Sequence, residues 1–199
     1  NTIGYDLEGF ANSAVTRSVT TPIIATELSD PVSLYLPFDS DVNDDSSNAH
    51  TGTASGSAAI TTSVKKYGAG SLSLNGTSQY VTYSNDADFQ FGSGDFTIEA
   101  WIYQTADAGS DPADRHPIVN RMASSTNRSF SVDIRDLDSK QKLVFGFTTD
   151  GSTSTEFRFD CDVTSSTWHH IAIVRSNSTV YGFLNGVSQS FAASGAWVI

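Results

Sequence analysis

Apolar and polar residues alternate over short stretches along most of this chain. Leu34, Leu36 and Phe38 are separated by single residues, and so are Leu72 and Leu74. A period of two is typical of a β-strand with one buried face. Similar stretches cover residues 80–83, 130–134, 143–147, 156–159, 170–174 and 179–184. No segment repeats apolar residues at helical spacing over three turns, so the pattern predicts an all-β chain.

Residues 95–104 form a stretch that is partly apolar on both faces. One face carries Phe96, Ile98, Ala100 and Ile102. The other face carries Thr97, Glu99, Trp101 and Tyr103. A strand that is apolar on both sides is typical of the middle of a sheet, so this stretch predicts a central strand.

Turn residues separate these stretches. Asn75-Gly76 precedes residues 80–83, Asp150-Gly151 follows residues 143–147, and Asn185-Gly186 follows residues 179–184. Residues 136–140 have turn composition too. Asn-Gly tolerates positive φ and indicates a hairpin. Many short strands joined by such turns predict an antiparallel two-sheet jelly-roll sandwich.

Residues 1–31 differ from the rest of the chain. Their apolar residues are scattered among Thr, Ser, Asn and Asp without a sustained period, and Pro22 and Pro31 lie near their end. We interpret them as an extended N-terminal arm before a globular domain at residues 32–199. The arm is either a flexible linker or a segment that becomes ordered against a neighbouring subunit.

Composition and charge exclude several classes of function. The 199 residues suit one domain, and the formal net charge of -11 argues against nucleic acid as a partner. No apolar run reaches the roughly 18–20 residues that cross a bilayer, so we expect no membrane insertion. Cys161 is the single cysteine, which excludes an internal disulfide and a cysteine-based zinc finger.

Five strings, taken in order, resemble the laminin-G-like members of the concanavalin-A-like lectin and glucanase superfamily. They are LYLPFD at 34–39, KYGAGSLSLNGTSQYVTY at 66–83, DFTIEAWIY at 95–103, STWHHIAIVRS at 166–176 and VYGFLNGV at 180–187. The resemblance covers residues 32–199 and implies a concanavalin-A-like jelly roll with one concave and one convex sheet.

The resemblance carries two further expectations. The family pattern normally continues past the LNG hairpin into closing strands, so a second chain or a rearranged terminus supplies them here, or one sheet edge is open. Ser-, Thr- and Gly-rich versions of the domain also occur in bacteriophage structural proteins, which this composition resembles.

The sequence argues against an enzyme. Catalytic relatives carry Glu-x-Asp-x-(x)-Glu on a central strand, and a retaining glycosidase needs two carboxyl groups about 5–5.5 Å apart. The comparable strand here has only Glu99, with Thr97 and Trp101 beside it on the same face. No Gly-x-Ser-x-Gly motif is present, and acidic neighbours would raise the pKa of Cys161.

An acidic loop is the candidate metal site. Its oxygen-bearing side chains are Asp39, Asp41, Asn43, Asp44 and Asp45. The loop fails as an EF-hand because position six is Asp44 instead of Gly and position twelve is His50 instead of Glu. Calcium on a sandwich loop and a solvated acidic turn both stay open, since relatives hold calcium at a loop after the first strand.

Aromatic side chains are the candidate ligand contacts. Trp101, Tyr103, Tyr181, Phe183 and Trp197 would stack on sugar rings if they face outward, and would be core residues if they face inward. We select Glu99, Trp101 and Tyr103 as ligand-binding candidates. His169 and His170 are adjacent, so a strand points them to opposite faces, and we expect one of them in the core.

Two functions follow from these features of the sequence. The first is a non-catalytic structural or assembly protein, such as a phage virion surface or appendage component, whose residues 1–31 contact other copies or neighbouring subunits. The second is a glycan-binding adhesion module of a secreted or cell-surface protein. Both predict a location on a virion surface or outside a cell.

Overall fold

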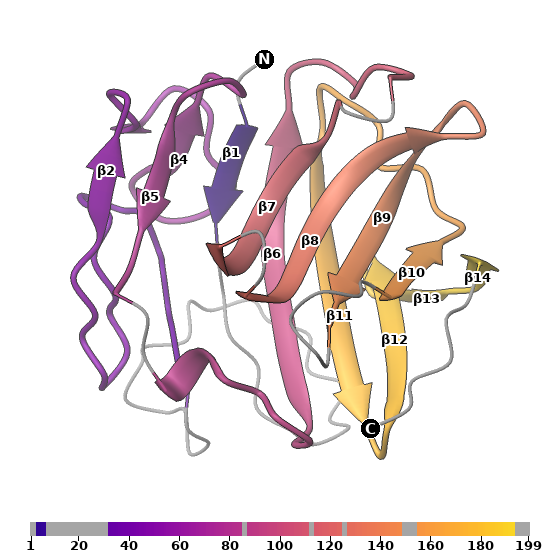
Figure 1. Cartoon of the computed structure of the whole chain (residues 1–199). Coiled ribbons are helices and arrows are strands. Elements are labelled where there is room, and N and C mark those ends of the chain that lie inside the picture. The colour runs from indigo at the N-terminus through magenta and orange to yellow at the C-terminus, as the bar shows by residue number, and fades with distance from the viewer. Residues whose placement is uncertain are drawn as a thin grey trace.

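A computed structural model describes residues 3–6, 32–84, 87–111, 114–124, 127–148 and 155–193. Strands form three sheets in this part of the chain (Figure 1). The only helical element in these ranges is a 3₁₀ turn at Ala87–Phe89, and no helix in them is long and apolar enough to cross a membrane. The prediction of an all-β chain is confirmed.

The larger sheet has seven antiparallel strands. In spatial order they are β13 (Val187–Gln189), β12 (Thr179–Leu184), β11 (Trp168–Ser176), β6 (Phe96–Gln104), β1 (Ile3–Asp6), β4 (Ser71–Leu74) and β3 (Ala59–Thr61). β6 lies inside the sheet between β11 and β1, so the predicted central strand is confirmed.

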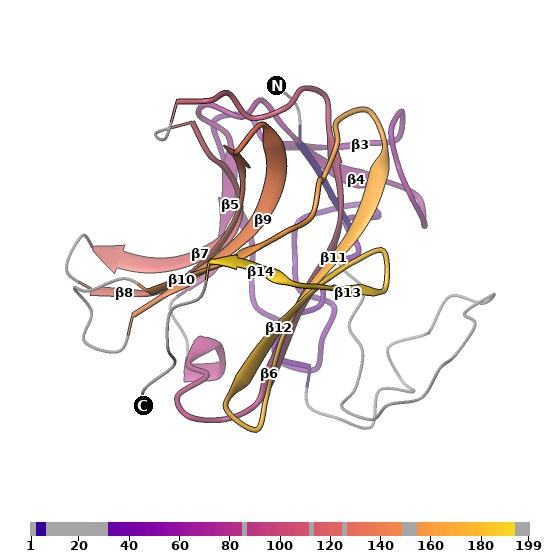
Figure 2. The same ribbon diagram turned by 90° about the vertical axis from the view of Figure 1, so that its right-hand side faces the viewer.

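The second sheet has five antiparallel strands and packs over the first (Figure 2). Its order is β14 (Phe191–Ala193), β10 (Thr155–Phe159), β9 (Lys140–Phe147), β8 (Asn127–Leu137) and β7 (His116–Ser124). A separate two-stranded sheet pairs β2 (Thr53–Ser55) with β5 (Tyr80–Thr82). The arrangement confirms the predicted two-sheet sandwich.

The core lies between the two large sheets. Ile102 and Ile173 from the seven-stranded sheet and Val132, Phe145 and Phe159 from the five-stranded sheet are almost completely buried in one cluster. Gly182 on β12 is required there, because a Cβ at this position would lie 2.4 Å from the ring of Phe159. The absence of a side chain at this point lets the aromatic ring fill the space between the layers.

Two of the predicted turns are confirmed, and both join the strands of a hairpin. Asp138 and Ser139 both have positive φ and join β8 to β9. Asn185 and Gly186 also both have positive φ, and they join β12 to β13. Two successive positive φ values match the twist of antiparallel strands, which explains these sequences. The predicted turn at residues 150–151 lies outside the described residues.

The predicted hairpin at Asn75-Gly76 is wrong. The strand before it, β4, pairs with β1 and β3, whereas the strand after it, β5, pairs with β2 in another sheet. Asn75 Oδ1 accepts hydrogen bonds from three successive backbone N–H groups, those of Thr77, Ser78 and Gln79. This side-chain turn sends the chain away from β4 instead of back along it.

Residues 34–38 are also not a strand, although their predicted burial is right. Leu36 and Phe38 are buried in the core. Pro37 has no N–H for a ladder, and the N–H and carbonyl of Tyr35 bond to Asp44 Oδ1 and to the N–H of Asp45. The backbone groups are therefore satisfied by the acidic loop that follows.

Four residues of the predicted N-terminal arm form β1 inside the seven-stranded sheet, between β4 and β6. The sequence pattern misses this strand because four residues are too few to show a period. Residues 7–31 lie outside the described residues, and the arm's contact with a neighbouring subunit stays a prediction. At the other end of the described chain, β14 follows the β12–β13 hairpin, and residues 194–199 lie outside the described residues.

Candidate functional site

The outer face of the seven-stranded sheet carries the three predicted ligand-binding residues. Glu99, Trp101 and Tyr103 alternate along β6 with Ala100 and Ile102, which are buried in the core. The alternation of a strand therefore turns the three candidates away from the core. Trp101 and Tyr103 are half-buried, so part of each ring lies at the surface.

Strand β11 adds two further rings to the same face. In the β6–β11 ladder Tyr103 lies opposite Trp168, and Trp101 lies opposite His170. The ring centres are 5.6 Å apart in the first pair and 5.2 Å apart in the second. Residues directly opposite in a ladder share a face, so the four rings form one patch. We call Trp101, Tyr103, Trp168 and His170 the aromatic face.

A loop from outside the sheet lies against this patch. The Lys66 Nζ lies 4.4 Å from the centre of the Trp101 ring, and the ring of Tyr67 meets the same indole edge-on at 5.5 Å. Lys66 is exposed, and 46 % of Tyr67 is exposed. The ammonium group therefore lies over the indole face on which a ligand would stack. A stacking ligand would bind beside this group or displace it.

The aromatic face also holds a carboxylate and an imidazole. Glu99 Oε2 lies 3.5 Å from His170 Nε2, and the two side chains are 9 % and 18 % exposed. These groups can accept and donate hydrogen bonds at the edge of the rings. Tyr181 and Phe183 on β12 point to the same outer side, since Val180 and Gly182, which alternate with them, are buried. Trp197 lies outside the described residues.

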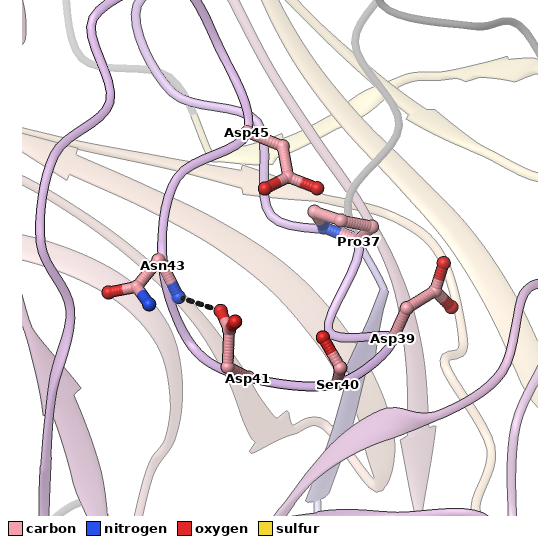
Figure 3. A pocket seen from close by; sticks show the side chains of 6 residues that line it. All are labelled: Pro37, Asp39, Ser40, Asp41, Asn43 and Asp45. Carbon is pink, nitrogen blue, oxygen red and sulfur yellow. Dashed lines mark hydrogen bonds between the residues drawn. The ribbon is translucent and has the colours of Figure 1, made fainter.

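The acidic loop forms a shallow, polar pocket. It is lined by Pro37, Asp39, Ser40, Asp41, Asn43 and Asp45. Figure 3 shows the carboxylates of Asp41 and Asp45 turned toward the space between the limbs of the loop, and the Asn43 amide turned outward. Asn43 Oδ1 accepts a hydrogen bond from the N–H of Gly52, which explains that orientation.

Four of the five predicted metal ligands, Asp39, Asp41, Asn43 and Asp44, accept hydrogen bonds from backbone N–H groups. Asp44 is 5 % exposed and does not line the pocket. Its carboxylate accepts hydrogen bonds from the N–H groups of Tyr35, Ser46 and His50 and from the Ser46 hydroxyl. Asp39 Oδ1 accepts from the N–H of Ala69. Asp44 therefore holds the loop together from inside.

A tyrosine fixes the back of the loop. The hydroxyl of Tyr83 donates a 2.6 Å hydrogen bond to the carbonyl of Val42, and burial raises the pKa of this phenol well above its usual value. Within the described ranges, no group of three or more His, Cys, Asp or Glu side chains is arranged to hold a metal ion. Asp41 and Asp45, whose carboxylates turn toward the pocket, and the hydroxyl of Ser40 provide oxygen donors that suit a hard cation such as calcium.

The outer face of the five-stranded sheet carries a charge network instead of rings. Arg135 Nη2 lies 2.6 Å from Asp133 Oδ2, and Arg135 Nη1 lies 2.8 Å from Glu156 Oε1. Arg158 binds the same glutamate at 3.0 Å. Although burial opposes it, hydrogen bonding to Arg135 and Arg158 leaves the pKa of Glu156 below its usual value. An ionised carboxylate locked between two guanidinium groups cannot act as a general acid.

His169 and Cys161 are two further reactive side chains, and both are buried. His169, next to His170, is 9 % exposed, so the prediction of one core histidine is confirmed. Its imidazole contacts Thr164 Oγ1 and Asn185 Nδ2 at 3.3 and 3.1 Å. Burial raises the pKa of the Cys161 thiol, the direction expected from its acidic neighbours, although burial is the larger cause.

Sequence reasoning found β6 but not its neighbours on the aromatic face. Trp168 and His170 alternate correctly within their strand, but the register that sets them opposite Tyr103 and Trp101 is not visible in either segment alone. Lys66 and Tyr67 come from a loop without periodicity. Only the three-dimensional structure brings these residues together.

Comparison with known proteins gives one family match of laminin G type. The family described as the concanavalin A-like lectin/glucanases superfamily matches residues 75–198. No curated protein matches the chain. The matched span contains β6 and β11, which carry all four residues of the aromatic face, whereas the acidic loop precedes it.

Proposed function

The chain belongs to the concanavalin A-like lectin/glucanases superfamily, and on this premise we propose that it is a non-catalytic module that binds carbohydrate at its aromatic face. The single observation that carries the proposal is the patch itself. Four rings from two neighbouring strands share one outward face with a carboxylate beside them. Among the described residues this is where large rings, hydrogen-bonding groups and surface access coincide.

Carbohydrate is the ligand class that suits these groups. A sugar ring presents C–H groups on its faces and hydroxyl groups around its edge. The first can lie against an aromatic ring such as Trp101, Tyr103 or Trp168. The second can bond to a carboxylate oxygen or an imidazole nitrogen, as offered by Glu99 and His170.

The absence of hydrolysis is part of the proposal. Glu99 lies opposite Ala172 in the β6–β11 ladder with His170 diagonal to it at 3.5 Å, and its neighbours on the same face of β6 are Thr97 and Trp101. On the opposite sheet Asp133 and Glu156 share one guanidinium, that of Arg135. Both arrangements argue against an acid and a nucleophile acting as a pair on one glycosidic bond.

A glycan array followed by titration of the best hit tests this proposal. We expect binding that weakens at least tenfold in Tyr103→Ala and in Trp168→Ala, with melting temperatures measured for every variant. Tyr80→Ala is the matched control, because Tyr80 is an aromatic residue that is 54 % exposed on the separate two-stranded sheet. Equal losses in all three variants, or release of sugar products, would contradict the proposal.

A role in assembly is the second candidate function, and exposed apolar side chains at the sheet edges favour it. We propose that residues 1–31 contact other copies of the chain or neighbouring subunits, as in a virion surface, an appendage or an extracellular structure. Val187 on β13 and Phe191 on β14 are 64 % and 41 % exposed at the edges of the two sheets, which adds apolar surface there. Native mass spectrometry without sugar tests this role through the number of subunits.

A further inference from the structure

Strand β1 fills an interior position of the seven-stranded sheet. On one side Ile3, Gly4 and Tyr5 pair with Leu74, Ser73 and Leu72 of β4. On the other side the four residues Ile3–Asp6 pair with residues 101–104 of β6. In the described sheet β4 and β6 are neighbours of β1 and not of each other. They leave between them a slot one strand wide, which we call the β4–β6 slot.

The slot needs an occupant. Without β1, the N–H and C=O groups of β4 and of the last residues of β6 that face the slot would have no ladder partner. Such an edge is a template for any extended segment of suitable length, because the ladder is made by main-chain groups. The same four residues in another copy of the chain satisfy it equally well.

The length of the segment between β1 and residue 32 does not determine whether the strand in the slot comes from the same chain or from another copy. Asp6 and Val32 are separated by residues 7–31, which are 25 residues long. At about 3.3 Å per residue, 25 residues can span up to roughly 80 Å, several times the radius of a domain of this size. The length therefore allows the strand to reach its own slot or the slot of a neighbouring molecule.

We propose that the β4–β6 slot is an acceptor site for the Ile3–Asp6 strand of a second copy of this chain. This inference rests on the assembly role proposed above and gives it a site. Exchange of an identical element costs little, since every pair lost within one molecule is regained between molecules. A linker of 25 residues corresponds to an effective concentration in the millimolar range, so exchange grows as the protein concentration approaches it.

Paired cysteines at opposite ladder positions test the proposal in the full-length chain. Gly4 and Ser73 lie opposite each other in an antiparallel ladder, where Cα atoms are about 4.5–5.5 Å apart and a disulfide can form. One tagged copy carries Gly4→Cys, a second carries Ser73→Cys, and a third carries both. The two single variants are refolded together at about 0.5 mM and oxidised, and each alone is the control for links through Cys161.

We expect the double variant to form a link within one chain, which shows that β1 occupies the slot. We also expect the mixture to give a disulfide-linked heterodimer that decreases at least fivefold when the chains are refolded at a tenfold lower concentration. A link within the double variant but no heterodimer above the controls overturns the exchange. No link in either overturns the occupancy of the slot and the proposal with it.

Two further measurements separate this inference from the assembly role. If Ser73→Cys prevents folding, Tyr103→Cys replaces it as the partner of Gly4→Cys, because Tyr103 lies opposite Gly4 in the β1–β6 ladder. Native mass spectrometry of the unmodified chain reports subunit number independently. Dimers without the cross-link between copies would contradict strand exchange and show that assembly uses another surface. Monomers at every concentration, again without the cross-link, would contradict both strand exchange and the assembly role.

Discussion

His116 and Gln104 join the two layers of the sandwich through a buried hydrogen bond. His116 Nδ1–H donates to Gln104 Oε1 over 2.6 Å, and Gln104 Nε2 donates to the carbonyl of Val163. Gln104 ends β6 in the seven-stranded sheet, and His116 begins β7 in the five-stranded sheet. Since an amide oxygen only accepts, this bond places a proton on Nδ1 of the imidazole.

We predict that the fold loses stability as the pH falls from about 7 to about 5.5. Burial lowers the pKa of His116 and of His169 below the usual value near 6.5. Between the folded and unfolded pKa the unfolded chain binds more protons, so acid favours unfolding. Urea unfolding at several pH values measures how steeply the free energy of unfolding changes with pH. His116→Gln and His169→Gln should each make this slope smaller. The same slope in all three proteins would contradict the account.

We predict that Arg135→Met costs about 3–5 kcal/mol of stability. The Asp133 side chain is 5 % exposed, and removal of its guanidinium partner at 2.6 Å leaves this buried charge only Arg115, which is 4.0 Å away and 47 % exposed. Arg158→Met is the matched control, since Arg158 binds Glu156 from a side chain that is 43 % exposed and should contribute less than about 1 kcal/mol. Urea unfolding at pH 7 measures the free energy of unfolding of both variants. Equal losses would contradict the prediction that Arg135 contributes more to stability than Arg158.

We predict that calcium, if it binds, uses Asp41 and Asp45 at the acidic loop. A ligand that binds only the folded state stabilises it by RT ln(1 + [L]/Kd), about 2.7 kcal/mol at a hundred times Kd. Millimolar calcium should then raise the melting temperature, EDTA should lower it, and Asp41→Asn/Asp45→Asn should abolish the response.

The control for the calcium prediction is Asp138→Asn. Asp138 is 85 % exposed in the β8–β9 turn, and its positive φ tolerates Asn. This variant should keep the full response to calcium. A melting temperature that ignores millimolar calcium in the unmodified protein would show that the loop binds none.

The sequence predicts the strands better than their partners. The alternation in residues 95–104 correctly places Glu99, Trp101 and Tyr103 on one outward face, because side-chain direction in a strand is a local property. Asn75-Gly76 and Asn185-Gly186 carry the same local signal, yet only the second makes a hairpin. Which sheet receives the next strand depends on contacts far away in the chain.

The candidate site shows the same division. Alternation alone sends His169 inward and His170 outward, but the register that sets His170 beside Trp101 is a property of two distant segments. Asp44 is the same residue type as Asp41 and Asp45, which line the pocket, and differs from them in being buried and in accepting hydrogen bonds from Tyr35 and Ser46. The pattern of apolar and polar residues carries no information on which distant strands pair or on which polar side chains are buried.

We predict that Lys66→Ala strengthens binding of a neutral glycan about two- to fivefold. The Lys66 ammonium lies over the Trp101 ring, and an exposed cation–π contact of about 0.5–1 kcal/mol must be given up when a sugar takes its place. Lys65→Ala is the matched control, because Lys65 carries the same charge in the same loop but contacts the carbonyl of Ala69. Weaker binding in Lys66→Ala would instead make this lysine a ligand contact.

The most direct test of carbohydrate binding at the aromatic face is NMR of the tryptophan indoles during a titration with the best glycan from the array. The chain has three tryptophans, and Trp101 and Trp168 both lie on this face. The account predicts that the indole N–H signals of Trp101 and Trp168 shift together along one saturating curve. Saturable binding that leaves both signals unmoved, or no binding by any glycan, would contradict it.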